Sequence, residues 1–364
     1  DVKSFFRRFY SPSNGSLAIA GDFDRNQVLD MVHRYFGDLL PGPPLPRMGR
    51  QDSPLAGRVE LEMRDKVSLP RLYISWPTPP DLDPDDAPLD VLQAIMSDGI
   101  SSRLHRTLVY EQQIAQSVGI RYYPSEIAGQ FTVQVSPADG HSLDEVEAAV
   151  DDELDKARQA PPTSDELERV RNRVEASHYR QLTRIGGFGG RADQLNHYSV
   201  LSKDPGLINS SLDRYMAVQP EDVQRVAQSV LNHRQVRLRV HPENQLKPAT
   251  VTVDRNIMPP AAPEPVFSPP MPVHRKLNNG LKIAVVEKRE MPVVSLGVFI
   301  KGGGTNAPES PPGLSTFTAQ MLQEGTETRS SQQLASDFEF IGARLSTDAR
   351  REFVSLSSET MNSH

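Results

Sequence analysis

A proline-rich stretch near the centre of the chain sets the strongest limit on how this sequence can fold. The segment 242–272 ends in PPAAPEPVFSPPMP, which has no apolar periodicity and few backbone donors for a helix or a sheet. Such a composition favours an extended, polyproline-like segment, which is typical of a linker and not of a packed core. We therefore expect a linker over 242–272, with separately folded parts before and after it.

The composition narrows the class of protein. A chain of 364 residues is too long for one ordinary core, which favours two or three domains. The net charge of -7 provides no basic field for nucleic acid, and the longest apolar run, Val293 to Ile300, is too short to span a membrane. The chain has no cysteine, which excludes disulfides and thiolate metal sites. We expect neither nucleic acid nor a membrane span among its partners.

Local patterns predict helices alternating with strands, which is the signature of an α+β fold. Asp24 is the expected N-cap of a helix in which Val28, Leu29, Val32 and Phe36 point inward. Thr163 and Glu166 form a capping-box pattern, and Leu143, Val146, Val150 and Leu154 share one face of a helix. The helices are expected over 2–9, 24–40, 87–112 with a break near Gly99, 142–159, from 163 onward, 219–232, 313–326 and 330–346. The strands are expected over 17–23, 71–79, 116–124, 129–137 and 235–243, with a hairpin after the linker whose two strands are joined by KREMP.

The segments Asp1–Gly21 and Asp222–His241 superpose without a gap, each as a helix followed by a strand. Asp1 meets Asp222, and Leu17 meets Leu238. Such an echo is expected if two domains share one α+β plan.

The segment GLSTFTAQMLQEGT, which begins at Gly313, predicts a helix with an unusual set of polar positions. Leu314, Phe317, Met321 and Leu322 fall at helical spacing on one face. Thr316, Ala319 and Gln320 lie beside them at the spacing at which a metal-binding helix would carry two ligands and a carboxylate. None of these three side chains is a good metal ligand.

Two segments resemble the pitrilysin/insulinase family of metallopeptidases, of the bacterial two-lobe type. DVKSFFRRFYSPSNGSLAIAGDFD with YFGDL is similar to the end of the family's first domain. NGLKIAVVEKREMPVVSLGVFIKGGG with PPGLSTFTAQMLQEGTETRS is similar to the start of a domain of the same family. The resemblance implies two similar lobes around a peptide chamber, each built of domains with a mainly antiparallel sheet packed against helices. Only one lobe of the family carries zinc.

The family's zinc motif is H-x-x-E-H on a helix, in which two histidines bind zinc and the glutamate polarises a water. Aligned on the flanking Gly-Leu and Gly-Thr, this chain has Thr316, Ala319 and Gln320 at the three functional places. The resemblance therefore implies that this helix belongs to the inactive lobe. We expect no catalytic, cofactor-binding or metal-binding residue in this chain, and the zinc of the family to be held outside it.

A second family feature is an Arg-Tyr pair, seven residues apart, by which the inactive lobe holds the substrate carbonyl. SSRLHRTLVYEQQIAQSV resembles the segment that carries the pair, and the aligned residues here are Val109 and Gln116. Their mismatch fits the second domain of the zinc-bearing lobe. The division implied is 1–66 as the tail of that lobe's first domain, 67–241 as its second domain, 242–272 as the linker, and 273–364 as the front of the inactive lobe.

Other motifs are better explained as structure than as sites. His178 and His197 lie in helical stretches with no carboxylate three or four positions after them, so solvated or capping roles are expected. Gly187, Gly189 and Ala192 match G-x-G-x-x-A, but they follow a helix and not a strand, which favours a hinge or helix break over a dinucleotide site.

Two functions remain open at this stage. The chain is expected to be part of a zinc-dependent endopeptidase that degrades or processes peptides and is completed by a zinc-bearing N-terminal region or partner subunit. The alternative is a catalytically inactive relative that acts as a scaffold or partner subunit. The family resemblance favours a periplasmic or other extracytoplasmic location. Because the sequence opens in the middle of a helix, we expect a piece of a longer protein, so the lack of a visible signal peptide decides nothing.

Overall fold

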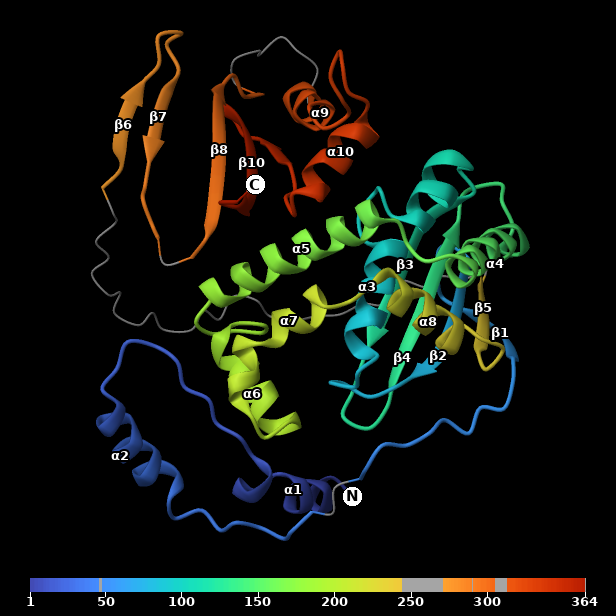
Figure 1. Ribbon diagram of the computed structural model, residues 1–364, viewed down its shortest axis with the longest axis vertical. Coiled ribbons are helices and arrows are strands. Elements are labelled where there is room, and N and C mark those ends of the chain that lie inside the picture. The colour runs from blue at the N-terminus through green and yellow to red at the C-terminus, as the bar shows by residue number, and fades with distance from the viewer. Residues whose placement is uncertain (46–47, 244–270, 290, 305–312, 364) are drawn as a thin grey trace.

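The computed structural model describes residues 1–45, 48–243, 271–289, 291–304 and 313–363 (Figure 1). Most of the predicted linker, 244–270, lies outside the described residues. Of the described part, one large region contains a five-stranded sheet and its helices, and a smaller region after the linker contains two further sheets. The α+β class predicted from the sequence is confirmed. None of the helices within the described ranges combines the length and the apolar character needed to cross a bilayer.

The five-stranded sheet forms the frame of the larger region, in the order β1-β5-β2-β4-β3. Only the β1–β5 pair is parallel. Its strands are β1 (Val59–Asp65), β2 (Arg71–Thr78), β3 (Ala115–Tyr123), β4 (Gly129–Pro137) and β5 (Val236–Pro242). Alternate residues of β2 and β4 are fully buried, among them Leu72, Ile74 and Phe131. Because side chains alternate along a strand, this places one face of the sheet against the core. Residues 59–65 belong to this sheet, although the sequence-based division assigned 1–66 to a preceding domain.

Helices cover the buried face of the sheet and then extend away from it. The larger region has α3 (Asp86–Ser97), the π-helix η2 (His105–Glu111), α4 (Leu143–Gln159), α5 (Ser164–Thr183), α6 (Arg191–Leu201), η3 (Pro205–Asn209), α7 (Ser211–Met216) and α8 (Pro220–Val230). The predicted stripe on α4 is buried throughout, and both halves of the capping box between Thr163 and Glu166 are formed at the start of α5. The predicted break near Gly99 separates α3 from η2, and the Gly187–Gly189 turn separates α5 from α6.

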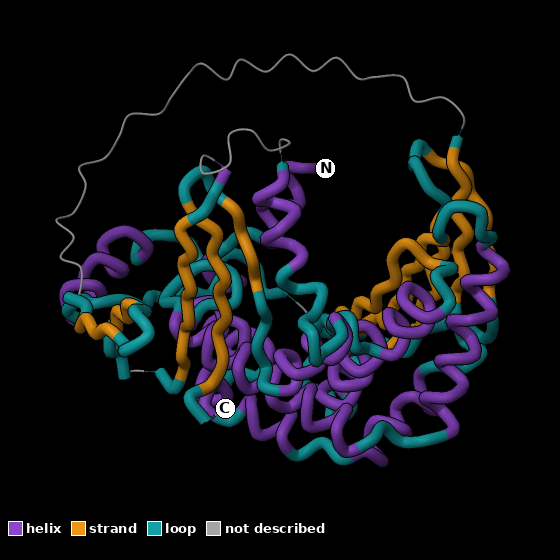
Figure 2. Tube along the Cα trace, turned by 90° about the horizontal axis from the view of Figure 1, so that it is seen from above, coloured by secondary structure: helices purple, strands orange, loops and turns teal. Residues whose placement is uncertain are grey.

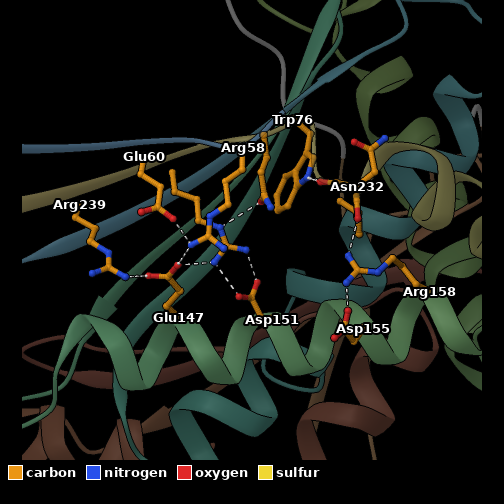
Figure 3. A network of polar contacts seen from close by, with 12 residues as sticks. Arg58, Glu60, Trp76, Glu147, Asp151, Asp155, Arg158, Asn232 and Arg239 are labelled. Atoms are coloured by element: carbon orange, nitrogen blue, oxygen red, sulfur yellow. Dashed lines mark hydrogen bonds and ion pairs between the residues drawn. The ribbon is translucent and has the colours of Figure 1, made fainter. Parts of the chain in front are cut away.

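Charged side chains tie β5 to α4 inside this core (Figure 3). Arg237 is only 5% exposed, and its guanidinium donates to Glu147 at 2.5 Å and to both oxygens of Asp151 at 2.8 and 2.6 Å. Arg239 also donates to Glu147, at 2.5 Å. Burial alone would raise the pKa of Glu147, but the hydrogen bonds from the two arginines outweigh it and lower that pKa. The network keeps these groups charged in a region where unpaired charges would be costly.

The described part of the region after the linker contains a three-stranded sheet, a separate pair of strands and two helices. Its elements are β6 (Val273–Lys276), β7 (Lys282–Val285), β8 (Val293–Lys301), α9 (Leu314–Met321), α10 (Ser331–Phe340), β9 (Ser346–Ala349) and β10 (Phe353–Met361). The strand order is β8-β10-β9, and β6 and β7 form a separate antiparallel pair. Seen from above, the helices fill the space between the five-stranded sheet and the three-stranded sheet (Figure 2).

The predicted hairpin after the linker is wrong in its pairing. The sequence suggested that KREMP joins two paired strands, whereas the structure pairs β7 with β6 and β8 with β10. The chain reverses at Gly280 instead, whose φ of +93° is readily adopted by glycine. The amide of Leu277 donates to Leu281 O at 2.9 Å and closes this turn. Because of this tight turn, β7 pairs with β6, which precedes it, and not with β8, which follows it.

The N-terminal segment contains α1 (Val2–Phe9), the short η1 (Pro12–Asn14) and α2 (Arg25–Phe36). Asp24 caps α2 as predicted, accepting from the amide of Gln27 at 2.9 Å. The expected inward face of α2 is wrong, because no residue of this helix is buried and Leu29 and Phe36 are exposed. The strand expected over 17–23 does not form within the described chain. A strand needs a ladder partner, and no such pairing to this segment is found there.

Candidate functional site

The helix α9 carries the three positions that the family resemblance singled out. Thr316 and Gln320 are exposed, and Ala319 is buried where α9 packs against β9 and β10. The apolar side chains Leu314, Phe317, Met321 and Leu322 are 39–61% exposed. The apolar face that the periodicity defined is therefore the outer face of α9, and the methyl group of Ala319 is its buried contact.

These three residues do not fit a zinc ion. A neutral hydroxyl and a neutral amide are poor zinc ligands, and the alanine methyl has no donor atom at all. Across the described residues, no group of three or more His, Asp or Glu side chains is arranged to hold a metal. That this chain binds no zinc remains a prediction, which a metal analysis can test.

Val109 and Gln116, the positions aligned with the Arg-Tyr pair, both lie where the backbone departs from regular geometry. Val109 is in the π-helix η2 and packs partly buried against the core. Gln116 is exposed on β3 at a β-bulge, because Ala115 pairs with Pro137 while Ser117 pairs with Ser136. π-Helical turns and β-bulges are devices that re-aim side chains and occur often near functional sites. The π-helix and the β-bulge are present here. The valine and the glutamine that they carry cannot bind a carbonyl in the way an arginine and a tyrosine would.

The two histidines that invited a metal search have ordinary partners or surroundings. His197 lies on α6 and its Nε2 is 2.9 Å from Asp81 Oδ2. The hydrogen bond to that carboxylate raises the pKa of His197, while burial lowers the pKa of His178 on α5. Neither arrangement brings together the three or four ligands of a zinc site.

No sequence pattern predicted the contact between α10 and the larger region, where Glu339 is the central side chain. Its Oε1 accepts from the amide of Ile100 at 3.1 Å, and its Oε2 accepts from the hydroxyl of Ser101. Arg169 of α5 lies 3.5 Å from the same carboxylate, and Asn172 Nδ2 donates to Phe340 O at 2.6 Å. These partners are more than 160 residues apart in sequence, and no local pattern links them.

The close approach at this contact depends on two glycines. A Cβ on Gly99, whose φ is +84°, would lie 2.2 Å from Glu339 Oε1, and a Cβ on Gly342 would lie 2.6 Å from Asn172 O. Both distances are shorter than real carbon contacts allow, so a side chain at position 342 would displace the backbone of α5, and one at position 99 would displace the Glu339 carboxylate. Figure 1 shows α10 beside α5, and the two helices are in contact.

Comparisons with known proteins assign the chain to one class of protein. The profile of the Peptidase M16 inactive domain matches residues 1–174, and that of insulinase, peptidase family M16, matches residues 282–364. The class is thus that of M16 peptidases, whose domains carry this α+β plan. The chain belongs to the pitrilysin/insulinase (M16) metallopeptidase family, as the two sequence segments indicated.

Curated relatives agree with this assignment. The chain is 28% identical over 243 residues to an uncharacterized zinc protease of Streptomyces coelicolor, SCO5738, an alignment that covers 64% of this chain and 51% of that protein. It is 25% identical over 122 residues to the zinc protease PqqE of Helicobacter pylori, covering 32% of this chain and 27% of that protein. The chain thus spans about half the length, or less, of these relatives.

Among solved structures, a protease from Helicobacter pylori matches with a TM-score of 0.60 and 18% identity, over 66% of this chain and 58% of that one. The periplasmic protease PqqL from Escherichia coli matches with a TM-score of 0.54 and 14% identity, over 99% of this chain and 44% of that one. At these identities the two structures support the fold alone.

Proposed function

We propose that this chain is part of a zinc-dependent endopeptidase that degrades or processes peptides in a chamber between two lobes, and that it contributes walls of the chamber but no zinc motif. The observation that carries the proposal is the order of the two family matches. An inactive-domain match over 1–174 is followed by an insulinase match over 282–364, in which α9 has Thr316, Ala319 and Gln320 at the metal positions.

The same order supports a division of roles along the chain. The part before the linker would be the rear of the zinc-bearing lobe, since Val109 and Gln116 replace the pair that the inactive lobe provides. The part after the linker would be the front of the inactive lobe. Zinc would then be held by a zinc-bearing N-terminal region or a partner subunit. Relatives with a stated activity are named zinc proteases, so the scaffold alternative gains no support from them.

We propose an extracytoplasmic location for the parent protein. The support is that PqqL, a neighbour in fold, is a periplasmic protease. Fractionation of the source cells tests this, and recovery of the protein in the cytosolic fraction alone would contradict it.

Metal analysis and a quenched-peptide assay test the proposal on the chain itself. After dialysis, with and without added zinc, we expect no bound zinc and no cleavage. Restoring the motif by Thr316→His, Ala319→Glu and Gln320→His should still give no activity, because Val109 and Gln116 stand at the positions aligned with the family's Arg-Tyr pair. General-base help alone is worth about 10²–10⁴ in rate, so its gain would be visible if the site were otherwise complete. Tight binding of one zinc per chain with chelator-sensitive cleavage would overturn the assignment.

A second test separates the endopeptidase from the scaffold. The gene region upstream of the codon for Asp1 should encode H-x-x-E-H, and the intact product should cleave an unstructured peptide in a chelator-sensitive way. Replacement of the motif's glutamate by glutamine should abolish cleavage and leave the fold intact. An upstream region without the motif, or an intact product without peptidase activity, would favour the scaffold.

A further inference from the structure

A cavity of about 380 Å³ lies where α5 faces the turn after α10, beside the Glu339 contact. The helix supplies Arg173, Ser177 and Arg180 at positions i, i+4 and i+7, which share one face. The other wall comes from the end of α10, the turn that follows it and β10: Glu339, Gly342, Ala343, Arg344 and Glu359. The cavity is thus bounded by both regions of the chain.

The side chains that line the cavity carry a net positive charge. The lining includes three arginines and two glutamates. Both glutamates are already engaged: Glu339 with Ile100, Ser101 and Arg169, and Glu359 with the hydroxyl of Ser295 at 2.8 Å. Glu359 also lies 3.7 Å from Arg180, a long ion pair, and the Arg180 guanidinium donates to Gly342 O at 3.3 Å.

The arginines are less well compensated than the glutamates. Arg173 pairs with Asp98 at 3.0 Å, whereas Arg344 is exposed at the cavity and has no ion pair within the described part of the chain. Burial lowers the pKa of Arg173, and the neighbouring Arg344 and Arg169 lower it further, against the opposing effect of Asp98 and Glu339. Guanidinium groups that repel one another across a cavity are stabilised when an anion enters between them.

We propose that this cavity binds a carboxylate of a peptide, either the terminal α-carboxylate or an acidic side chain. A guanidinium presents a planar fork that matches a carboxylate, and Ser177 adds a hydroxyl donor on the rigid helix. The volume leaves room for the residues next to the carboxylate. A multiply charged phosphate is less suited, because Glu339 and Glu359 would repel it. The inference rests on the proposed function, since a peptidase chamber is where such a ligand would be met.

Calorimetric titration of the 364-residue chain tests the proposal with four probes: acetylated penta-alanine as the free acid, the same peptide as its amide, the amide with one internal glutamate, and acetate. We expect the acid, or the glutamate peptide, to bind at least tenfold more tightly than the neutral amide. Tighter binding of the acid would identify a chain terminus as the ligand, and tighter binding of the glutamate peptide an acidic side chain. Equal binding of all three peptides would overturn the proposal. Acetate binding as tightly as the peptides would mean an adventitious ion only, and would overturn it too.

Matched variants locate the site. Arg344→Gln should weaken binding of the acidic peptide about tenfold. If circular dichroism shows that this variant alters the fold, Arg180→Gln takes its place and should weaken binding to the same extent. Arg121→Gln removes the same charge from an exposed position on β3 and should leave binding unchanged. Unchanged binding in the folded cavity variants would refute the site.

The binding result is independent of the zinc question. If the cavity fails to bind a carboxylate but the intact parent cleaves a neutral peptide, only the cavity proposal is lost. If the carboxylate binds but the parent lacks peptidase activity, the proposed function fails and the binding site remains.

Discussion

Replacing Arg237 by methionine should destabilise the larger region by about 3 kcal/mol. Methionine keeps an unbranched apolar stem but removes the three charged hydrogen bonds to Glu147 and Asp151. Removal of one partner from a buried ion pair costs about 3–5 kcal/mol. The low end of that range applies, because Glu147 keeps Arg239 at 2.5 Å and Arg58 at 3.3 Å. Asp151 is also 39% exposed at its side chain, so water replaces part of what it loses.

The single tryptophan makes the measurement specific to this region. Trp76 is 1% exposed in the sheet core, and its indole Nε1 donates to Asn232 O at 2.9 Å (Figure 3). Its fluorescence therefore follows unfolding of the five-stranded sheet without a signal from the rest of the chain. With a urea m-value of about 2 kcal/mol/M, the loss should lower the urea midpoint by about 1.5 M.

Two further variants decide whether the reasoning holds. Arg121→Met, at an exposed position on β3, should change stability by less than about 0.5 kcal/mol. Asp151→Asn should cost about 1 kcal/mol, because this carboxylate is partly solvated and Arg237 keeps Glu147. A midpoint for Arg237→Met within about 0.3 M of the parent, or above it, would show that desolvation cancels the ion pairing and would refute this account.

Two other perturbations test the buried carboxylate on α3 and the contact at α10. Burial raises the pKa of Asp90 to about 6, with the charge of Asp86 adding to it and the hydrogen bond from Tyr215 opposing it. The folded pKa of Asp90 lies above its ordinary value of 3.8. The free energy of unfolding should therefore be highest below about pH 4 and should fall as the pH rises to about 6, because the unfolded chain loses this proton first. Asp90→Asn should abolish this slope and be about 3 kcal/mol more stable at pH 8, and an equal effect at pH 4 in urea titrations would contradict the assignment. Glu339→Ala should raise hydrogen exchange at the amide of Ile100 at least tenfold with no change in β2 or β4, and unaltered exchange would show that the α10 contact does not depend on this carboxylate.

Much of the secondary structure, and the lack of zinc ligands on α9, could be predicted from the sequence, because both depend on residues that are close together in the chain. Thr163 and Glu166 satisfy each other's backbone amides within one turn, so the start of α5 is readable from four residues. The stripe on α4 and the strands β3 and β4 follow from periodicity in the same way. The replacement of zinc ligands by Thr316, Ala319 and Gln320 is a matter of residue identity, which no folding step can alter.

Facing and pairing were decided only by the tertiary structure. On β5, alternation separates Arg237 and Arg239 from Val236 and Leu238, but it does not say which set faces the helices. The structure turns the arginines inward, because the acidic face of α4 pairs with them across about 90 positions of sequence. Likewise β8 pairs with β10, and α9 buries Ala319 while its larger apolar side chains stay outside. Each of these outcomes depends on which distant element supplies the complementary surface, and a periodic pattern records only that two faces differ.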